Sequence, residues 1–156
     1  MSTLDRALRL TMIAAFGSAI VLAGAYAFQH LGGMAPCKLC LWQRWPHAAA
    51  IVIGAVVVLT KQMRLAWLGA LAALSTAAIG AYHVGVEQGW WEGPTSCTSS
   101  GVSNLSAEQL MEQILAAPLV RCDDIAWQLA GISMAGWNAI ASLCLAALWI
   151  KAARAA

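Results

Sequence analysis

Four long apolar runs without Asp, Glu, Lys or Arg constrain the fold of this chain more than any other feature. They cover residues 10–30, 45–60, 65–83 and 125–150. A helix that crosses a membrane needs about 17 to 25 predominantly apolar residues, and each run reaches that length once the second is extended slightly. Only 10% of the 156 residues are charged, against roughly 25% in an ordinary soluble domain. The sequence therefore predicts an integral membrane protein.

The four runs occupy most of the chain, which favours one compact helical bundle over two domains. We expect an all-α, four-helix membrane bundle in which residues 1–156 form a single membrane domain. The expected spans are approximately residues 10–29, 43–60, 65–83 and 131–150, with outward loops at about 30–42 and 84–130. In the second loop, Ser106 and Gln109 fit a capping box and predict a short amphipathic helix over residues 106–117, before Pro118.

The basic residues predict the orientation of this bundle. Six of the nine lie on the side of the chain termini, and three lie on the side of the two outward loops: Arg6, Arg9, Lys61, Arg64, Lys151 and Arg154 against Lys38, Arg44 and Arg121. Because short cytoplasmic segments are enriched in Lys and Arg, both termini are expected in the cytoplasm. The net charge of +2 reflects this topology, and no basic patch indicates a nucleic-acid partner.

A cleaved signal peptide is the alternative for the N-terminal run. Arg6 and Arg9 precede it, and Ala25-Tyr26-Ala27 has the small-residue pattern of a cleavage site. The run is longer than the 7 to 15 residues of a usual signal-peptide core, which favours an uncleaved first span.

Five cysteines divide into two groups in this topology. Four lie in the outward loops, and one lies within the last span: Cys37, Cys40, Cys97 and Cys122, and then Cys144. An oxidising outer compartment such as the periplasm permits disulfides in the loops. The isolated Cys144 is expected to pack as a small hydrophobic residue.

A disulfide would serve a different purpose in each of the two outward cysteine pairs. A disulfide between Cys97 and Cys122 closes a long loop and could simply staple it, a contribution of about 3 to 4 kcal/mol. A disulfide between Cys37 and Cys40 closes almost no loop, so its use is chemical: redox exchange or metal binding. Zinc is an open alternative because His30, His47 and His83 lie near the outward span ends, although the spacing of the second pair does not fit a zinc knuckle. We expect no metal.

The residues after Cys40 indicate a reactive thiol. Pro46 suits the first turn of a helix, which predicts that the second helix begins near Trp45. Cys40 and Arg44 then lie at a helix N-terminus, where the partial positive charge and the guanidinium both favour a thiolate. Taken alone, Arg44 is also compatible with a span-flanking cation that reaches the headgroups.

Tryptophans mark both ends of the expected spans. Four cluster at the outward end and two lie at the inner end: Trp42, Trp45, Trp90 and Trp91, and then Trp67 and Trp149. An aromatic belt at the membrane interface accounts for this placement. Flat apolar rings beside a C-x-x-C pair would also suit a lipid-soluble aromatic acceptor.

These features together resemble one family. The segment FQH before PCKLC, the run LCLWQRWP, four expected spans and a cysteine pair in the next outward loop resemble the DsbB family of the bacterial inner membrane. This resemblance implies a quinone-dependent protein thiol:disulfide oxidoreductase whose cofactor is a ubiquinone or menaquinone. Its partner would be a periplasmic DsbA-type thioredoxin-fold oxidase.

The resemblance also implies roles for single residues. Cys97 would form the mixed disulfide with the partner, and Cys122 would be its pair. Cys37 and Cys40 would pass the electrons on, with Cys40 as the thiolate beside the quinone and Arg44 as its electrostatic partner. His83 is a candidate quinone contact, with an interfacial hydrogen-bonding role as the alternative. A non-catalytic scaffold, or the same relay serving a dedicated partner or another acceptor, remains a competing hypothesis.

Overall fold

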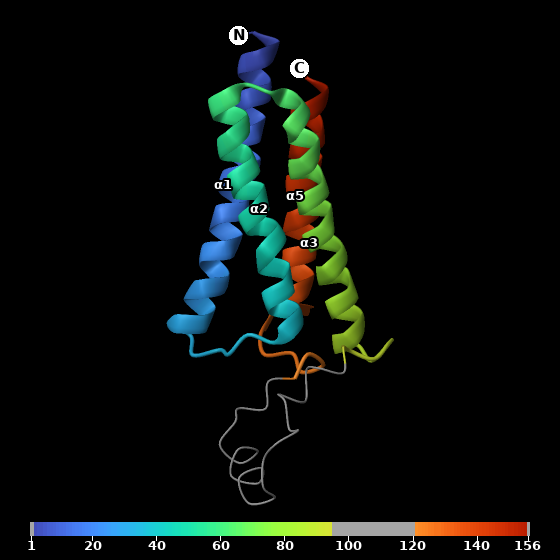
Figure 1. Cartoon of the computed structure of the whole chain (residues 1–156). Helices are drawn as coiled ribbons and strands as arrows, with labels where there is room; N and C mark the ends of the chain where they lie inside the picture. The colour runs from blue at the N-terminus through green and yellow to red at the C-terminus, as the bar shows by residue number, and fades with distance from the viewer. Residues whose placement is uncertain (1, 95–120, 156) are drawn as a thin grey trace, which may run out of the picture.

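The computed structural model describes residues 2–94 and 121–155. Its long elements are four helices: α1 (Thr3–His30), α2 (Lys38–Thr60), α3 (Ala66–Glu87) and α5 (Met134–Arg154), with a short 3-10 helix η1 (Met63–Leu65) before α3. All four are long and apolar enough to cross a membrane. They stand side by side as a bundle with the N- and C-termini at the same end (Figure 1). The predicted all-α, four-helix membrane bundle is confirmed.

The distribution of side chains over the bundle suits lipid on its outside. Large apolar residues such as Ile13, Phe16 and Leu71 are more than half exposed, whereas the interior is rich in alanine and glycine. A Cβ atom added to Gly54 would lie 2.4 Å from the Cβ of Ala15 on α1. Such small residues allow helix backbones to approach closely, which is how helices associate in lipid without a hydrophobic driving force between them.

Helix α2 begins earlier than the sequence predicted. The prediction of a start near Trp45 is wrong, because the helix starts at Lys38 and Pro46 lies inside it. Cys37 is the N-cap, and its sulfur accepts a hydrogen bond from the backbone N–H of Cys40. This cap satisfies one of the free N–H groups of the first turn, and the proline removes only one interior hydrogen bond. Cys40 thus lies in the first turn, and Arg44 lies one turn further along.

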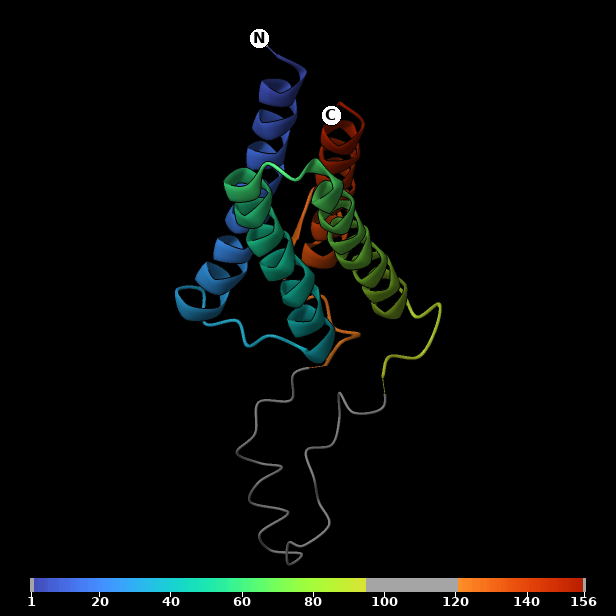
Figure 2. The same cartoon turned by 45° about the horizontal axis from the view of Figure 1, so that its top comes forward.

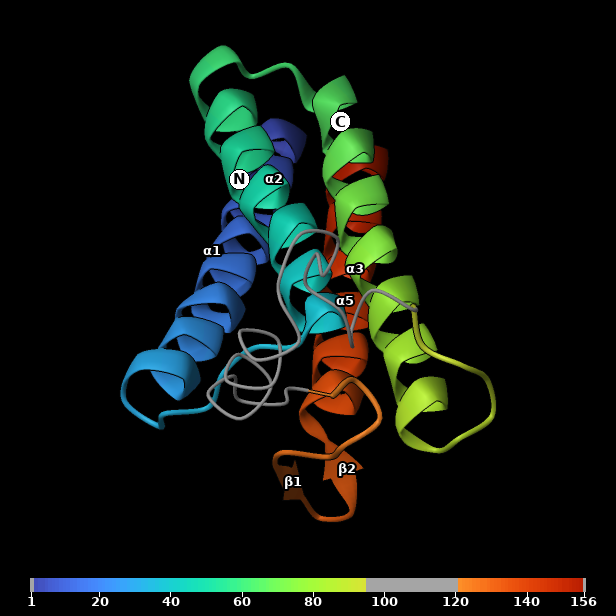
Figure 3. The ribbon, with the colours of Figure 1, turned by 60° about the horizontal axis from the view of Figure 1, so that its bottom comes forward.

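A small β-hairpin precedes the last helix and was not predicted. Strands β1 (Gln128–Leu129) and β2 (Ile132–Ser133) pair in antiparallel register across a two-residue turn. Both turn residues have positive φ, 53° at Ala130 and 76° at Gly131, as the tight hairpin turns require. Ser133 then caps α5 by accepting a hydrogen bond from the N–H of Gly136. The hairpin extends beyond the end of the bundle (Figure 3).

Two further expectations differ from the structure. Cys144 does not pack inside the bundle but is exposed on its outer surface. Trp149 is fully buried, so it is a core residue and not part of an aromatic belt, because glycine at position 69 of α3 leaves room for its ring. The expected helix at 106–117 and Cys97 lie outside the described residues.

Candidate functional site

The C-x-x-C pair lies where α2 begins, at the end of the bundle opposite the termini (Figure 2). Cys37 and Cys40 are free thiols with their sulfur atoms 2.8 Å apart. A disulfide bond is about 2.0 Å long, so only a small movement separates the dithiol from the bonded form. Cys37 is buried, with 4% of its surface exposed. The pair can therefore change oxidation state without rearrangement of the helix.

The two thiols are chemically unequal. Cys37 donates its hydrogen to the Cys40 sulfur. This hydrogen bond, together with burial, raises the pKa of the Cys37 thiol. Cys37 therefore keeps its proton, and a negative charge on the pair resides on Cys40, which also faces the partial positive charge of the first helical turn.

Arg44 is fixed one turn beyond Cys40 by residues of α1. Its guanidinium donates to the side-chain oxygen of Gln29 and to the carbonyl oxygen of Ala25, and it stacks over the ring of Tyr26 at 4.8 Å from the centroid. A guanidinium held in this way keeps its charge near Cys40 instead of extending to lipid headgroups. Residues four apart on a helix share a face, so Arg44 favours a thiolate at Cys40 through Coulomb attraction.

His83 of α3 connects the C-x-x-C pair with the second outward loop. Its Nε2 atom lies 3.6 Å from the Cys37 sulfur and 3.2 Å from the carbonyl oxygen of Cys122. Cys37 and Cys122 also belong to one small buried cluster with Leu39 and Val86. Cys122 is disulfide-bonded. Two segments far apart in the sequence are thus joined at a single histidine.

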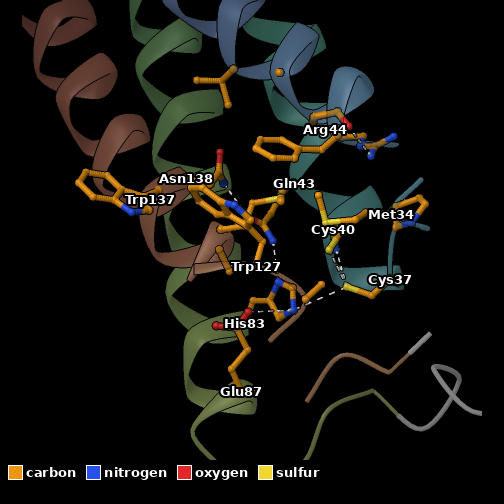
Figure 4. A pocket seen from close by; sticks show the side chains of 18 of the residues that line it. Met34, Cys37, Cys40, Gln43, Arg44, His83, Glu87, Trp127, Trp137 and Asn138 are labelled. Atoms are coloured by element: carbon orange, nitrogen blue, oxygen red, sulfur yellow. Dashed lines mark hydrogen bonds and ion pairs between the residues drawn. The ribbon is translucent and has the colours of Figure 1, made fainter. Parts of the chain in front are cut away.

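A chain of polar side chains, all buried except the half-buried Asn138, leads from His83 into the bundle (Figure 4). Gln43 donates to His83 Nδ1 at 3.0 Å, and Asn138 of α5 donates to the Gln43 side-chain oxygen at 2.6 Å. Asn138 in turn faces Nε2 of His47 at 2.9 Å. These residues could not be connected from the sequence, because they come from three different helices and their meeting depends on how the helices rotate. The signal was present only as polar residues within apolar spans, which favour a functional role.

Glu87 and Ser133 extend the polar site toward the hairpin. The Ser133 hydroxyl donates to Glu87 Oε2, and Glu87 Oε1 lies 3.9 Å from His83 Nε2. The N-cap of α5 is therefore tied to the last turn of α3 at the site. This contact gives the unpredicted hairpin a function in positioning the start of α5.

A cavity of about 480 Å³ opens beside the thiols. Its polar lining includes Cys40, Arg44 and His83, and its walls are mostly apolar side chains, among them Phe28, Met34, Ala126, Trp127, Met134 and Ala141. This size and this mixture of apolar walls with a few polar groups are typical of small-molecule sites. Two lining residues carry a buried polar atom with no partner among the described residues, Nε of Arg44 and Nδ1 of His47. Two residues that line the cavity therefore have unused hydrogen-bonding capacity.

The donor atoms of Cys37, Cys40 and His83 all lie within 4.8 Å of one another, as a metal site requires. The hydrogen bonds of His83 oppose this use. Because Gln43 donates to Nδ1, the neutral ring carries its proton on Nε2, the atom that faces the thiols. A metal ligand must present a bare nitrogen, so metal binding would require the loss of the Gln43 contact.

Comparison with known proteins places this architecture in a family. A family model described as disulfide bond formation protein DsbB matches residues 7–152. The chain belongs to the DsbB family. It is 31% identical to Disulfide bond formation protein B 2 of Pseudomonas aeruginosa over 89% of this chain and 86% of that protein. It is 26% identical to Disulfide bond formation protein B of Albidiferax ferrireducens over 94% and 90% of the two chains.

An uncharacterized protein of Rickettsia prowazekii is 27% identical over 90% of this chain and 84% of its own length. No solved structure matches the chain. Membership of the DsbB family, together with four helices able to span a membrane, identifies a multi-pass membrane protein that acts as a thiol oxidoreductase in disulfide bond formation. The structure brings Cys37, Cys40, Arg44, His83 and Cys122 to one end of the bundle.

Proposed function

We propose that this DsbB-family chain reoxidises a periplasmic DsbA-type dithiol and transfers the electrons to a membrane quinone. Two electrons and two protons leave the partner dithiol, which becomes a disulfide, and the same number reduces quinone to quinol. Within this chain, Cys97 attacks or is attacked by the partner, Cys122 is its pair, and Cys37 and Cys40 pass the electrons on. The observation that carries this proposal is the junction at His83, where Cys37 and Cys122 meet beside the cavity.

Several features of the cavity fit a quinone. Its walls are largely apolar, it opens beside Cys40, and the lining residue Arg44 has an Nε–H group with no hydrogen-bond partner among the described residues. Cys40, Arg44 and His83 would hold the ring. When bound, the quinone supplies the driving force, because a DsbA-type couple near −120 mV is too oxidising to pass electrons to an ordinary dithiol.

The chain's own groups prepare the thiols for this transfer. Arg44 and the first turn of α2 stabilise a negative charge on Cys40, and Cys37 retains its proton. Stabilising the reduced form makes a dithiol pair more oxidising, which is also the reason that DsbA is a strong oxidant. His83 Nε2–H lies between Cys37 and the Cys122 carbonyl, where it orients the two segments toward each other.

We further propose that the protein lies in the bacterial inner membrane with both termini cytoplasmic. The two cysteine-bearing loops then face the periplasm, where the partner is found. The balance of six basic residues against three supports this orientation. Residues 1–156 would form one membrane domain, with the described helices as its spans.

Turnover with a reduced DsbA-type protein and quinone tests the function. Replacement of Cys37, Cys40, Cys97 or Cys122 by serine should abolish quinone reduction. The loss of quinone absorbance measures this reaction. Cys144→Ser is the matched control and should keep full turnover, because Cys144 is exposed on the outside of the bundle. Full turnover by Cys40→Ser, or thiols that do not change state when quinone is added, would contradict the proposal.

A further inference from the structure

We propose that His47, oriented by Asn138, is a hydrogen-bond acceptor for a hydroxyl group of the reduced quinone. It would favour quinol over quinone in the cavity. This inference rests on the proposed function, since it assigns a residue to the cofactor of the same site. It concerns a histidine that neither the C-x-x-C motif nor the junction at His83 involves.

His47 is an unusual residue for the interior of an apolar helix. Only 2% of its surface is exposed, and it lines the cavity together with Cys40 and Arg44. Its Nδ1 atom is buried and has no hydrogen-bond partner among the described residues. Buried polar atoms are nearly always paired, because an unpaired one destabilises the fold. His47 lines the cavity, and a ligand there that donates a hydrogen bond to Nδ1 would satisfy this unpaired atom.

A backbone carbonyl group fixes the orientation of the side-chain amides of Gln43 and Asn138. Gln43 directs its side-chain nitrogen at the carbonyl oxygen of Leu39, at 3.2 Å, which only a donor can satisfy. The oxygen of the same amide must then face Asn138, whose nitrogen lies 2.6 Å away. Thr76 supports this assignment, because its hydroxyl already donates to the backbone carbonyl oxygen of Gln43 and so accepts from the Asn138 nitrogen.

The side-chain oxygen of Asn138 determines the tautomer of His47. Since the Asn138 nitrogen is used, its oxygen faces Nε2 of His47 at 2.9 Å. An oxygen acceptor requires that Nε2 carry the hydrogen, so Nδ1 of the neutral ring is a bare acceptor. Ser142 lies 3.4 Å from the same Nε2 and leaves Nδ1 untouched.

A bare nitrogen in an apolar cavity discriminates between the two states of a quinone. The oxidised ring has only carbonyl acceptors and gains nothing from Nδ1, whereas the quinol has hydroxyl donors. The Nε–H of Arg44 at the same cavity can serve oxygens of either state. His47 therefore adds a contact that exists only after reduction. Tighter binding of the product makes the bound quinone a stronger oxidant toward Cys37 and Cys40.

Binding of a decyl-substituted benzoquinone and its quinol to purified protein in detergent tests this role. All variants carry Cys40→Ser, so that binding is measured without thiol exchange. His47→Gln keeps a nitrogen donor for Asn138 and removes the acceptor at the Nδ1 position. Because one net hydrogen bond contributes about 0.5 to 1.5 kcal/mol, its quinol affinity should fall roughly 2- to 10-fold. Its quinone affinity should not change.

Two further variants separate recognition from structure. Ser142→Ala is the matched control, since it removes only the other contact of Nε2, and it should bind both ligands as the background protein does. His47→Asn places an amide oxygen near the Nδ1 position and should retain most of the quinol preference. Equal affinities of His47→Gln and the background for quinol, or an equal loss for quinol and quinone, would overturn the inference.

Nitrogen-15 NMR of the His47 ring gives a readout that needs no substitution at this position. Nδ1 should be unprotonated in the ligand-free protein, and its signal should shift when quinol is added but not when quinone is added. A protonated Nδ1 in the free protein would refute the assignment. If neither the background protein nor the parent protein with Cys40 in place binds quinone, the proposed function itself fails, which is a different result from a loss of discrimination.

Discussion

At the scale of single residues, the inequality of the two thiols is the central chemical feature. Cys37 is both the N-cap of α2 and the donor to Cys40, so one side chain starts the helix and holds the proton of the pair. A helix N-terminus usually takes Ser, Thr, Asp or Asn as its cap. Cysteine in that position combines the cap with redox chemistry.

The pH dependence of alkylation should reveal this inequality. The hydrogen bond to Cys40 and burial raise the pKa of Cys37, so its neutral thiol persists to higher pH than that of an ordinary cysteine, whose pKa is near 8.5. In the reduced protein, iodoacetamide should modify Cys40 before Cys37 at neutral pH. Mass spectrometry of peptides after timed quenching measures this order.

The variant Cys40→Ala provides the control for this prediction. It removes the sulfur acceptor, so Cys37 should become reactive at lower pH than in the parent protein, while burial keeps part of the effect. An unchanged pH profile of Cys37 in Cys40→Ala would show that the hydrogen bond does not govern its proton.

At the scale of helices, close contact between α3 and α5 depends on glycine. A Cβ atom on Gly69 would lie 2.5 Å from the ring of Trp149, the largest fully buried side chain among the described residues. Real Cβ atoms do not approach so closely, and an indole ring inside a bundle has little freedom to move. Small residues at this position therefore set how near the two helices lie.

Gly69→Ala should destabilise the bundle by about 1 to 3 kcal/mol, the usual cost of an overpacked interior. Gly24→Ala in α1 is the matched control, because no atom lies within 4 Å of the added Cβ. Its stability should be unchanged or slightly higher, since alanine favours a helix more than glycine does. Thermal unfolding in detergent, followed by circular dichroism, measures both variants. Equal melting temperatures would show that Trp149 adapts without cost.

The helices were more predictable from the sequence than their ends. Apolar runs define spans because the bilayer imposes a length, whereas a helix start depends on local competition. At α2 the Cys37 cap outweighs the signal of Pro46. At α5 the apolar run from 125 to 150 conceals the hairpin, since the turn at Ala130 and Gly131 lacks the usual Asn-Gly pair.

The residues of the candidate site also differ in how far the sequence predicts that they lie together. The grouping of Cys37, Cys40 and Arg44 was predictable because their spacing at the start of one helix is itself the signal, whereas their roles stay a prediction. The hydrogen bonds from His83 through Gln43 and Asn138 to His47 join α3, α2 and α5. Their partners lie dozens of residues apart, so only the packing of the bundle brings them together.

At the scale of the whole molecule, the described residues form a bundle whose two ends differ chemically. Both termini lie at one end, and the hairpin lies at the other (Figures 1 and 3). The thiols and the cavity are at the hairpin end. A bundle with four spans has its termini on one side of the membrane, so a single experiment on either end fixes the orientation of the other. The excess of basic residues at the terminal end predicts that this end is cytoplasmic.

Labelling of intact cells should confirm this orientation. In a protein whose five cysteines are replaced by serine, a single cysteine is introduced at Glu92, which is exposed at the thiol end, or at Ser2, which is exposed at the terminal end. A membrane-impermeant maleimide applied to cells with a permeabilised outer membrane should label Glu92→Cys and not Ser2→Cys. Lysis before labelling should make both reactive, which shows that Ser2→Cys is accessible in principle. Labelling of Ser2→Cys alone in intact cells would reverse the topology and place the thiols in the reducing cytoplasm, where a disulfide-generating relay would have no stable product.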